Sequence, residues 1–173
     1  RMLPPKRKDP PEVFRFEEWQ RVVVATKPFY RPLVEFMVLT GMSASELSAL
    51  RVEDVEGDVI KVRRSHTLGK DKESLKNSYR VRDIPITAAI RRCIDVALRG
   101  RKGGRVFVMK SGRPVDADNF RKNVWTGVRN REGLAYRKPY PTRHTFAAWS
   151  LTAGLHPERL VKLMGHGDKI MVY

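Results

Sequence analysis

The chain has 173 residues, and its 35 lysine and arginine residues outnumber 19 acidic ones, which gives a formal net charge of +16. This length predicts one domain with a sizeable core, and a hydrophobic content of 41% excludes a wholly disordered chain. The positive charge favours a polyanionic partner, with nucleic acid ahead of a membrane surface. Because no apolar run could span a bilayer and no signal-peptide pattern is visible, we expect a cytoplasmic location.

The chain begins with a proline-rich, charged stretch. Residues 1–12 (RMLPPKRKDPPE) are typical of a linker or of the end of a preceding domain. The first residue is not methionine, so we expect the chain to be a fragment. Residues 13–173 are then expected to form the single domain.

Apolar spacing predicts two helices and a short third one in the first third of the chain. The first helix opens at Phe16. The second begins at Pro32 and ends near Gly41, because glycine favours a helix C-terminus. Either Ser43 or Ser45 can then cap the short helix that follows.

Three short strands are predicted in the middle of the chain. Val59–Arg64 and Tyr79–Ile86 both alternate apolar and polar residues, which is typical of the two arms of a hairpin. The polar and basic stretch 65–78 is expected to connect them as a loop. Val106–Met109 is predicted to be a third strand.

Four further helices are predicted, over residues 87–99, 116–131, 143–154 and 157–165. In the first of them Cys93 lies on an apolar face, which predicts a packed thiol. As the single cysteine, it excludes an internal disulfide and a cysteine-based metal site. The expected fold class is α+β and mainly helical, with a small three-stranded antiparallel sheet.

Three stretches of the sequence match the motifs of one known family. LTGMSASELSALRVEDV (39–55) resembles the first signature box of the tyrosine recombinases and phage integrases. YPTRHTFAAWSLTAGLHPERLVKLMGHGD (140–168) resembles their second box, and LKNSYRVRDIPI (75–86) is similar to their hairpin. The resemblance extends from about Phe14 onward, and the second box is its most specific part.

The resemblance implies a recombinase catalytic core that cuts and rejoins double-stranded DNA at attachment sites, with no metal or nucleotide cofactor. In this family a tyrosine attacks the scissile phosphate and stays attached to the DNA 3′ phosphate. A 5′ hydroxyl then reverses the linkage. The family's pocket holds two arginines, a lysine, a histidine, a second histidine or tryptophan, and the tyrosine, and strand exchange takes place in a tetramer on DNA.

The resemblance places four residues of this chain in the catalytic pocket. Arg143 matches the second-box arginine, which can bind two phosphate oxygens at once, and His166 matches the Gly-His histidine, which can hydrogen-bond the phosphate. Lys76 matches the hairpin lysine that protonates the 5′ oxygen, with a plain phosphate contact as the alternative. Tyr140 stands where a histidine is usual, and it either donates a hydrogen bond to the phosphate or packs between Pro139 and Pro141.

Ser43 marks the clearest departure from the family's motif. The family has an arginine at this position, and its loss should lower the cleavage rate by on the order of 10²–10³. Either this member is degenerate, or it was altered, or another basic side chain substitutes. Glu46 and His144 are expected to support the pocket from within rather than to touch the phosphate.

Tyr173 is the second choice for the nucleophile. It lies seven residues after His166, whereas the resemblance implies a spacing of about nine or ten. By that spacing the attacking tyrosine would follow the last residue given, and the catalytic domain is expected to be cut short at its C-terminal end.

The hairpin carries most of the basic residues that are predicted to contact the DNA backbone. Such contacts give an affinity that depends on salt and little on sequence. The predicted residues are Lys61, Arg63, Arg64, Lys70, Lys72, Arg80 and Arg82, and the run from Arg99 to Arg105 is a further candidate.

Two other functions remain open from the sequence. The first is a recombinase-fold protein that binds DNA without chemistry, which the serine at position 43 favours. The second is an RNA-binding protein, which rests on the charge alone.

Overall fold

The computed structural model of the protein describes residues 13–75, 78–133 and 141–166. The α-helices are α1 (Phe16–Ala25), α2 (Arg31–Thr40), α3 (Ala44–Ala49), α4 (Ala88–Leu98), α5 (Ala117–Phe120), α6 (Thr126–Arg131), α7 (Pro141–Thr152) and α8 (Pro157–Met164). The strands are β1 (Val55–Glu56), β2 (Val59–Val62), β3 (Ser65–Thr67), β4 (Lys70–Lys72) and β5 (Arg82–Pro85). Short 3₁₀ turns are η1 (Pro28–Tyr30), η2 (Val52–Asp54) and η3 (Ser78–Arg80), and the π-helical η4 (Arg121–Trp125) joins α5 to α6.

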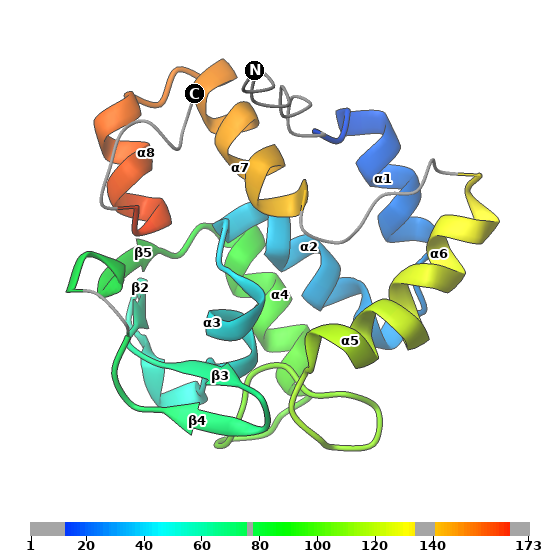
Figure 1. The fold of residues 1–173 in the computed structure, drawn as a ribbon, viewed down its shortest axis with the longest axis horizontal. Coiled ribbons are helices and arrows are strands. Elements are labelled where there is room, and N and C mark those ends of the chain that lie inside the picture. The colour runs from blue at the N-terminus through cyan, green and yellow to red at the C-terminus, as the bar shows by residue number, and fades with distance from the viewer. Residues whose placement is uncertain (1–12, 76–77, 134–140, 167–173) are drawn as a thin grey trace, which may run out of the picture.

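Helix α2 is the central element of the helical part. It contacts α1, α4 and α7, which surround it (Figure 1). Because it is covered on several sides, it buries seven of its residues, including Phe36 and Thr40 at its last turn. Gly41 ends the helix with a φ of 61°, a left-handed conformation that glycine adopts at little cost.

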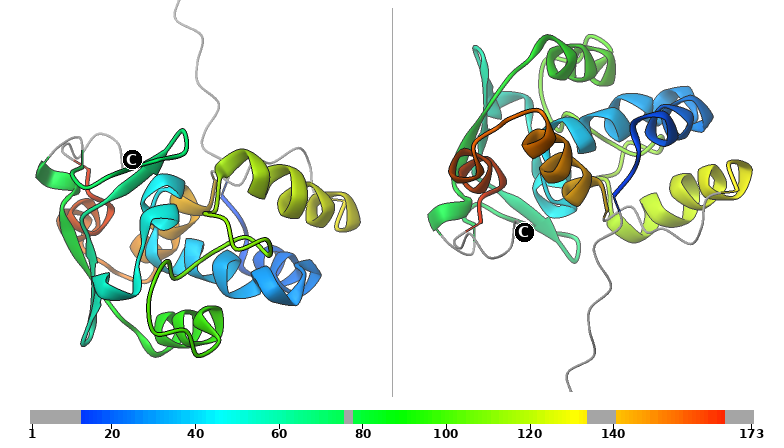
Figure 2. Two further views of the ribbon diagram at one scale, coloured as in Figure 1. Left: turned by 90° about the horizontal axis from the view of Figure 1, so that it is seen from below. Right: turned by 90° about the horizontal axis from the view of Figure 1, so that it is seen from above.

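The small sheet lies at the opposite end of the molecule from α1 and α6 (Figures 1 and 2). Its strands run antiparallel in the order β1-β2-β5, with Ile60 opposite Ile84 and Val62 opposite Arg82. Helix α8 packs against β5. The expected mainly helical α+β fold with a three-stranded antiparallel sheet is confirmed.

The third strand of this sheet differs from the predicted one. Residues 106–109 form no strand, and this region makes only isolated bridges, between Arg51 and Arg105 and between Val108 and Pro114. The third strand is β1, for which the sequence predicted no strand. The prediction failed because Val106 and Phe107 owe their apolar character to burial in the core rather than to strand pairing.

The stretch 65–78, predicted as a loop, contains a second hairpin of β3 and β4. Leu68 and Gly69 make its two-residue turn, and both have positive φ angles, 52° and 73°. This is the backbone of the turns that match the twist of short hairpins. The strand residues are mostly polar and exposed, so the sequence lacks the alternation that marks a strand.

Asp71 attaches this hairpin to the body of the protein. Its carboxylate accepts hydrogen bonds from Arg105 Nη2 at 2.7 and 2.8 Å and from Arg51 Nη2 at 3.1 Å, and it contacts His66 Nδ1 at 2.7 Å. The bonds from Arg105, and then those from His66 and Arg51, hold the pKa of Asp71 well below its usual range. The hairpin that leads towards Lys76 is therefore fixed by charge rather than by apolar packing.

The helices agree closely with those predicted. Helix α4 begins after Thr87, whose side chain caps it, and ends at Leu98 with Arg99 as its C-cap. Cys93 is 2% exposed, and burial, with the charge of Glu35, raises the pKa of its thiol to about 12. The prediction of a packed thiol is confirmed. Among the described residues, no helix is both long and apolar enough to cross a membrane.

Replacing Asp71 tests the attachment of the hairpin. We expect Asp71→Asn to lower the free energy of unfolding by about 1–2 kcal/mol, because the charge-assisted bonds to Arg105 and Arg51 are lost. Hydrogen exchange at the amides of β3 and β4 should accelerate. Since the folded state lowers the pKa of Asp71, the stabilisation is complete above about pH 4 and is lost as the pH falls below that value. The control is Asp58→Asn, whose side chain is 99% exposed, and equal exchange in the two variants would contradict the attachment.

Candidate active site

Ser43 and Glu46 set the geometry at the start of α3. Ser43 is the N-cap, and its Oγ accepts a hydrogen bond from Glu46 N at 3.4 Å. In return, Ser43 N donates to Glu46 Oε2 at 2.9 Å. This reciprocal capping box turns the carboxylate of Glu46 back towards the start of the helix, where it is 3% exposed.

Arg82 of β5 binds the carboxylate of Glu46 with both terminal nitrogens. Nη1 donates to Glu46 Oε1 at 2.9 Å and Nη2 donates to Glu46 Oε2 at 3.0 Å. The side chain of Arg82 is only 6% exposed. Burial alone would raise the pKa of Glu46, but the hydrogen bonds and charge of Arg82 and the bond from Ser43 N lower it. The carboxylate is therefore ionised at neutral pH.

Arg143 approaches the same carboxylate from the first turn of α7. Its Nη1 lies 3.9 Å from Glu46 Oε2 and donates to Gly41 O at 2.5 Å. Its Nη2 donates to Met164 O at the end of α8. The close packing of α7 requires glycine at position 41, because a Cβ there would lie 2.4 Å from the ring of Phe146.

The end of α8 brings His166 into the group. Gly165 ends the helix with a φ of 63°, and His166 N donates to Val161 O at 3.1 Å. Within the described residues, the buried Nδ1 of His166 has no hydrogen-bond partner. Burial, followed by the charges of Arg143, Arg82 and Arg80, lowers the pKa of His166 to about 4. The imidazole is therefore neutral at pH 7.

His144 follows Arg143 on α7 and is half-buried. Burial, and then the charge of Arg143, lowers the pKa of its side chain. A neutral imidazole at this position adds no further positive charge next to Arg143.

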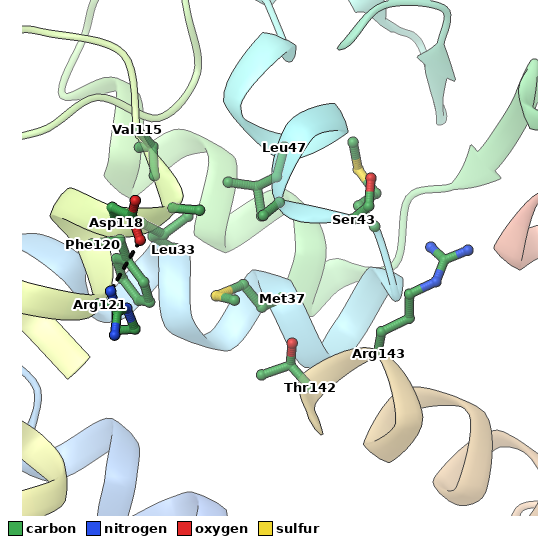
Figure 3. Close-up of a pocket in the computed structure, with 13 residues that line it drawn as sticks. Leu33, Met37, Ser43, Leu47, Val115, Asp118, Phe120, Arg121, Thr142 and Arg143 are labelled. Carbon is green, nitrogen blue, oxygen red and sulfur yellow. Dashed lines mark hydrogen bonds and ion pairs between the residues drawn. The ribbon is translucent and has the colours of Figure 1, made fainter. Parts of the chain in front are cut away.

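A mainly apolar cavity of about 220 Å³ lies beside these residues. Figure 3 shows Ser43 and Arg143 at one end and the ion pair of Asp118 with Arg121 at the other, with Met37 between them. The serine at position 43 therefore faces a hollow next to Arg143.

The structure brings together Ser43, Glu46, Arg143 and His166, which belong to motifs far apart in the sequence. The structure also places Arg82 in this group. Arg82 was predicted to contact the DNA backbone, but its side chain is buried and does not reach the surface. Its place could have been read from the alternation of its strand, because Arg82 shares the inward face with Ile84. Lys76, Tyr140 and Tyr173 lie outside the described residues.

Three of the other basic residues predicted to contact DNA are engaged in ion pairs. Lys61 pairs with Glu56, Arg63 pairs with Asp83 and Arg64 pairs with Asp54, Glu53 and Glu73. Lys70, Lys72 and Arg80 are exposed on β4 and η3.

The run 99–105 mostly serves the fold. Arg99 stacks 4.1 Å over the ring of Phe29, and Arg101 donates to Arg105 O at 2.7 Å and to Val106 O at 3.1 Å. Arg105 holds Asp71, whereas Lys102 is exposed.

The grouped residues favour an anion. The buried guanidinium of Arg82 and the half-buried one of Arg143 face one carboxylate, and the neighbouring imidazole is neutral, so the site carries a net positive charge. Planar guanidinium groups bind phosphate oxygens in pairs. In the part of the chain that the structure describes, no three His, Cys, Asp or Glu side chains come together as metal ligands.

Curated proteins with similar sequences are integrases and recombinases. The chain is 29% identical to the prophage integrase IntR of Escherichia coli K12 over 94% of its own length and 46% of that protein. It is 30% identical to the tyrosine recombinase XerC of Herpetosiphon aurantiacus over 80% of its own length and 44% of that protein. The chain thus spans less than half the length of these curated relatives.

Solved structures of other integrases have the same fold as this chain. The Tn1549 transposon integrase in complex with a circular intermediate DNA matches 97% of this chain and 62% of its own, with a TM-score of 0.82 and 20% identity. A lambda integrase tetramer bound to a Holliday junction matches 95% of this chain and 49% of its own, with a TM-score of 0.71 and 15% identity. At these identities the likeness shows a shared fold.

The model of the phage integrase family matches residues 12–173, which is nearly the whole chain. This match confirms the resemblance that the two signature boxes and the hairpin indicated. The chain belongs to the phage integrase family of tyrosine recombinases.

Proposed function

We propose that this chain supplies the catalytic core of a site-specific recombinase that cleaves and rejoins DNA through a 3′-phosphotyrosyl intermediate. The observation that supports it most is the convergence of Arg143 and His166 beside the buried carboxylate of Glu46. These residues come from α7, the end of α8 and α3, so the fold rather than the local sequence assembles them.

Arg143 is the proposed ligand of the scissile phosphate. Its terminal nitrogens donate to the backbone carbonyls of Gly41 and Met164, which are neutral acceptors. A phosphate oxygen is charged and forms stronger bonds with a guanidinium, so it can displace these carbonyls. The same positive charge would stabilise the extra charge of the pentavalent transition state.

His166 and Lys76 take the remaining steps at the phosphate. A neutral imidazole can donate one N–H to a phosphate oxygen without holding a charge of its own. A tyrosine in the segment after His166 forms the new O–P bond as its phenolic proton passes to solvent water. The P–O5′ bond breaks, and Lys76 gives its proton to the departing 5′ oxygen. Tyr140 would add a hydrogen bond to the phosphate, and His144 would support Arg143.

Duplex DNA is the proposed partner, and the solved relatives support it by the complexes that their names describe, which include a tetramer on a Holliday junction. Lys70, Lys72 and Arg80 are exposed, so they are the proposed backbone contacts of the hairpin region. We propose self-association on DNA, with a tetramer as the assembly that exchanges strands.

Covalent capture on a nicked duplex tests the proposed function. The duplex releases a short fragment after cleavage, so religation is blocked and a protein–DNA adduct accumulates. The protein should include any residues that follow Tyr173 in its gene. An adduct resistant to denaturant supports the proposal, whereas tight duplex binding with no adduct would leave a DNA-binding protein without chemistry.

Replacing Arg143 tests the phosphate ligand. We expect Arg143→Gln to lower the rate of adduct formation by on the order of 10²–10³, since one charged donor to the transition state is lost. Duplex affinity, measured by fluorescence anisotropy, should fall far less. The matched control is Arg131→Gln on α6, which also donates to a backbone carbonyl, that of Ala25 at 2.7 Å. Equal rates in the two variants would rule out the assigned role.

Restoring the family's arginine tests the cost of Ser43. We expect Ser43→Arg to raise the rate of adduct formation by on the order of 10²–10³, because a second phosphate donor returns. The same change removes the Ser43 Oγ that caps α3, which should lower the free energy of unfolding by about 1 kcal/mol. Ser43→Ala separates the two effects, because it removes the cap without adding a charge. A rate no higher in Ser43→Arg than in Ser43→Ala would show that another group already fills this role.

A further inference from the structure

Arg82 holds together three elements of the site without facing solvent. It starts from β5, binds both oxygens of Glu46 on α3, and donates from Nε to Leu163 O on α8 at 2.6 Å. Nη1 also donates to Arg80 O at 3.0 Å. Almost all of its donors are thus used inside the protein, which leaves no role for it as a direct DNA contact.

The end of α8 depends on this guanidinium. Arg82 binds the carbonyl of Leu163, and Arg143 binds that of the next residue, Met164. The chain passes so close to Arg82 that a Cβ at Gly165 would lie 2.9 Å from its Nη1. His166 is the next residue after Gly165, so its position depends on the position of the Arg82 guanidinium.

Glu46 creates a competition between the two guanidinium groups. A buried carboxylate needs charged partners, and an unpaired one would draw the nearest cation towards it. Arg82 occupies both of its oxygens at 2.9 and 3.0 Å, whereas Arg143 stays 3.9 Å away. The carboxylate is therefore paired mainly with Arg82, and Arg143 makes its closer contacts with the carbonyls of Gly41 and Met164.

We propose that Arg82 is a positioning residue: by saturating Glu46 and fixing the end of α8, it keeps Arg143 from closing onto Glu46 and holds His166 beside it. This inference rests on the proposed function for its catalytic consequence. The structural part of the inference is that Arg82 determines the positions of Arg143 and His166. This part does not depend on whether the protein cleaves DNA.

A double-mutant cycle tests the competition. Arg82→Gln leaves Glu46 ionised and poorly paired, so Arg143 should shift onto it and the adduct rate should fall by on the order of 10²-fold. Adding Glu46→Gln removes the charge that attracts Arg143. The double variant should therefore form adducts at least about tenfold faster than Arg82→Gln alone, a coupling within the range for contacting residues. Because Glu46→Gln can also restore stability by removing the unpaired charge, the adduct rates are compared at a temperature at which thermal unfolding shows every variant to be folded.

The controls address folding and general charge. Arg92→Gln removes another ion-paired arginine, whose partner Glu35 lies 2.8 Å away on α2, and it should leave the adduct rate unchanged. If Arg82→Gln does not fold, as thermal unfolding will show, Arg82→Lys carries the test. It keeps the charge but loses the two-point bond to Glu46, so a partial loss of rate is expected.

A titration of His166 by nuclear magnetic resonance separates this inference from the proposed function. The groups that act on its imidazole are Arg143, Arg82, Arg80 and Glu46. The pKa of His166 should rise in Arg82→Gln, because a positive charge is lost and the end of α8 is released. If the unaltered protein forms no adduct, the proposed function fails, and this titration still tests whether Arg82 acts on His166. An unchanged pKa of His166, or a double variant no faster than Arg82→Gln, would overturn the inference.

Discussion

The buried negative charge of Glu46 is the constraint around which the site is built. A carboxylate that is 3% exposed must be met by positive groups and hydrogen-bond donors, and these come from β5, α7 and the N-cap of α3. Removing one partner of such a buried pair typically costs about 3–5 kcal/mol, because the other charge is left alone. The relative placement of β5, α3 and α7 is therefore tied to a single side chain, that of Glu46.

The sequence predicted the helices well because their caps and glycines are local signals. Gly41 and Gly165 lie at helix ends as expected. The sheet was predicted less well, since β3 and β4 are polar strands attached through Asp71, and no apolar alternation marks them. For the site, the motifs identified Arg143 and His166. The alternation of β5 indicates that Arg82 faces inward, but it does not reveal that its partner is Glu46, 36 positions away.

The structure shows that only some of the many basic residues are available for contacts with a partner. Many arginines hold the fold together, as Arg64 does with its acidic neighbours and Arg101 does with backbone carbonyls. The hairpin residues Lys70 and Lys72, by contrast, are exposed. Composition favours a polyanionic partner, but it cannot separate the arginines that support the structure from those that face outward.

The two-point bond between Arg82 and Glu46 also has a consequence for how sequences of this kind can diverge. A substitution at either position alone leaves a buried charge unmatched, whereas a joint replacement by apolar residues of similar size can be tolerated by the fold. The two positions should therefore change together or not at all in descendants of a common ancestor. Ser43 lies beside the same residues but is not constrained in this way. Its hydrogen bond to Glu46 N can be lost without leaving a buried charge unpaired.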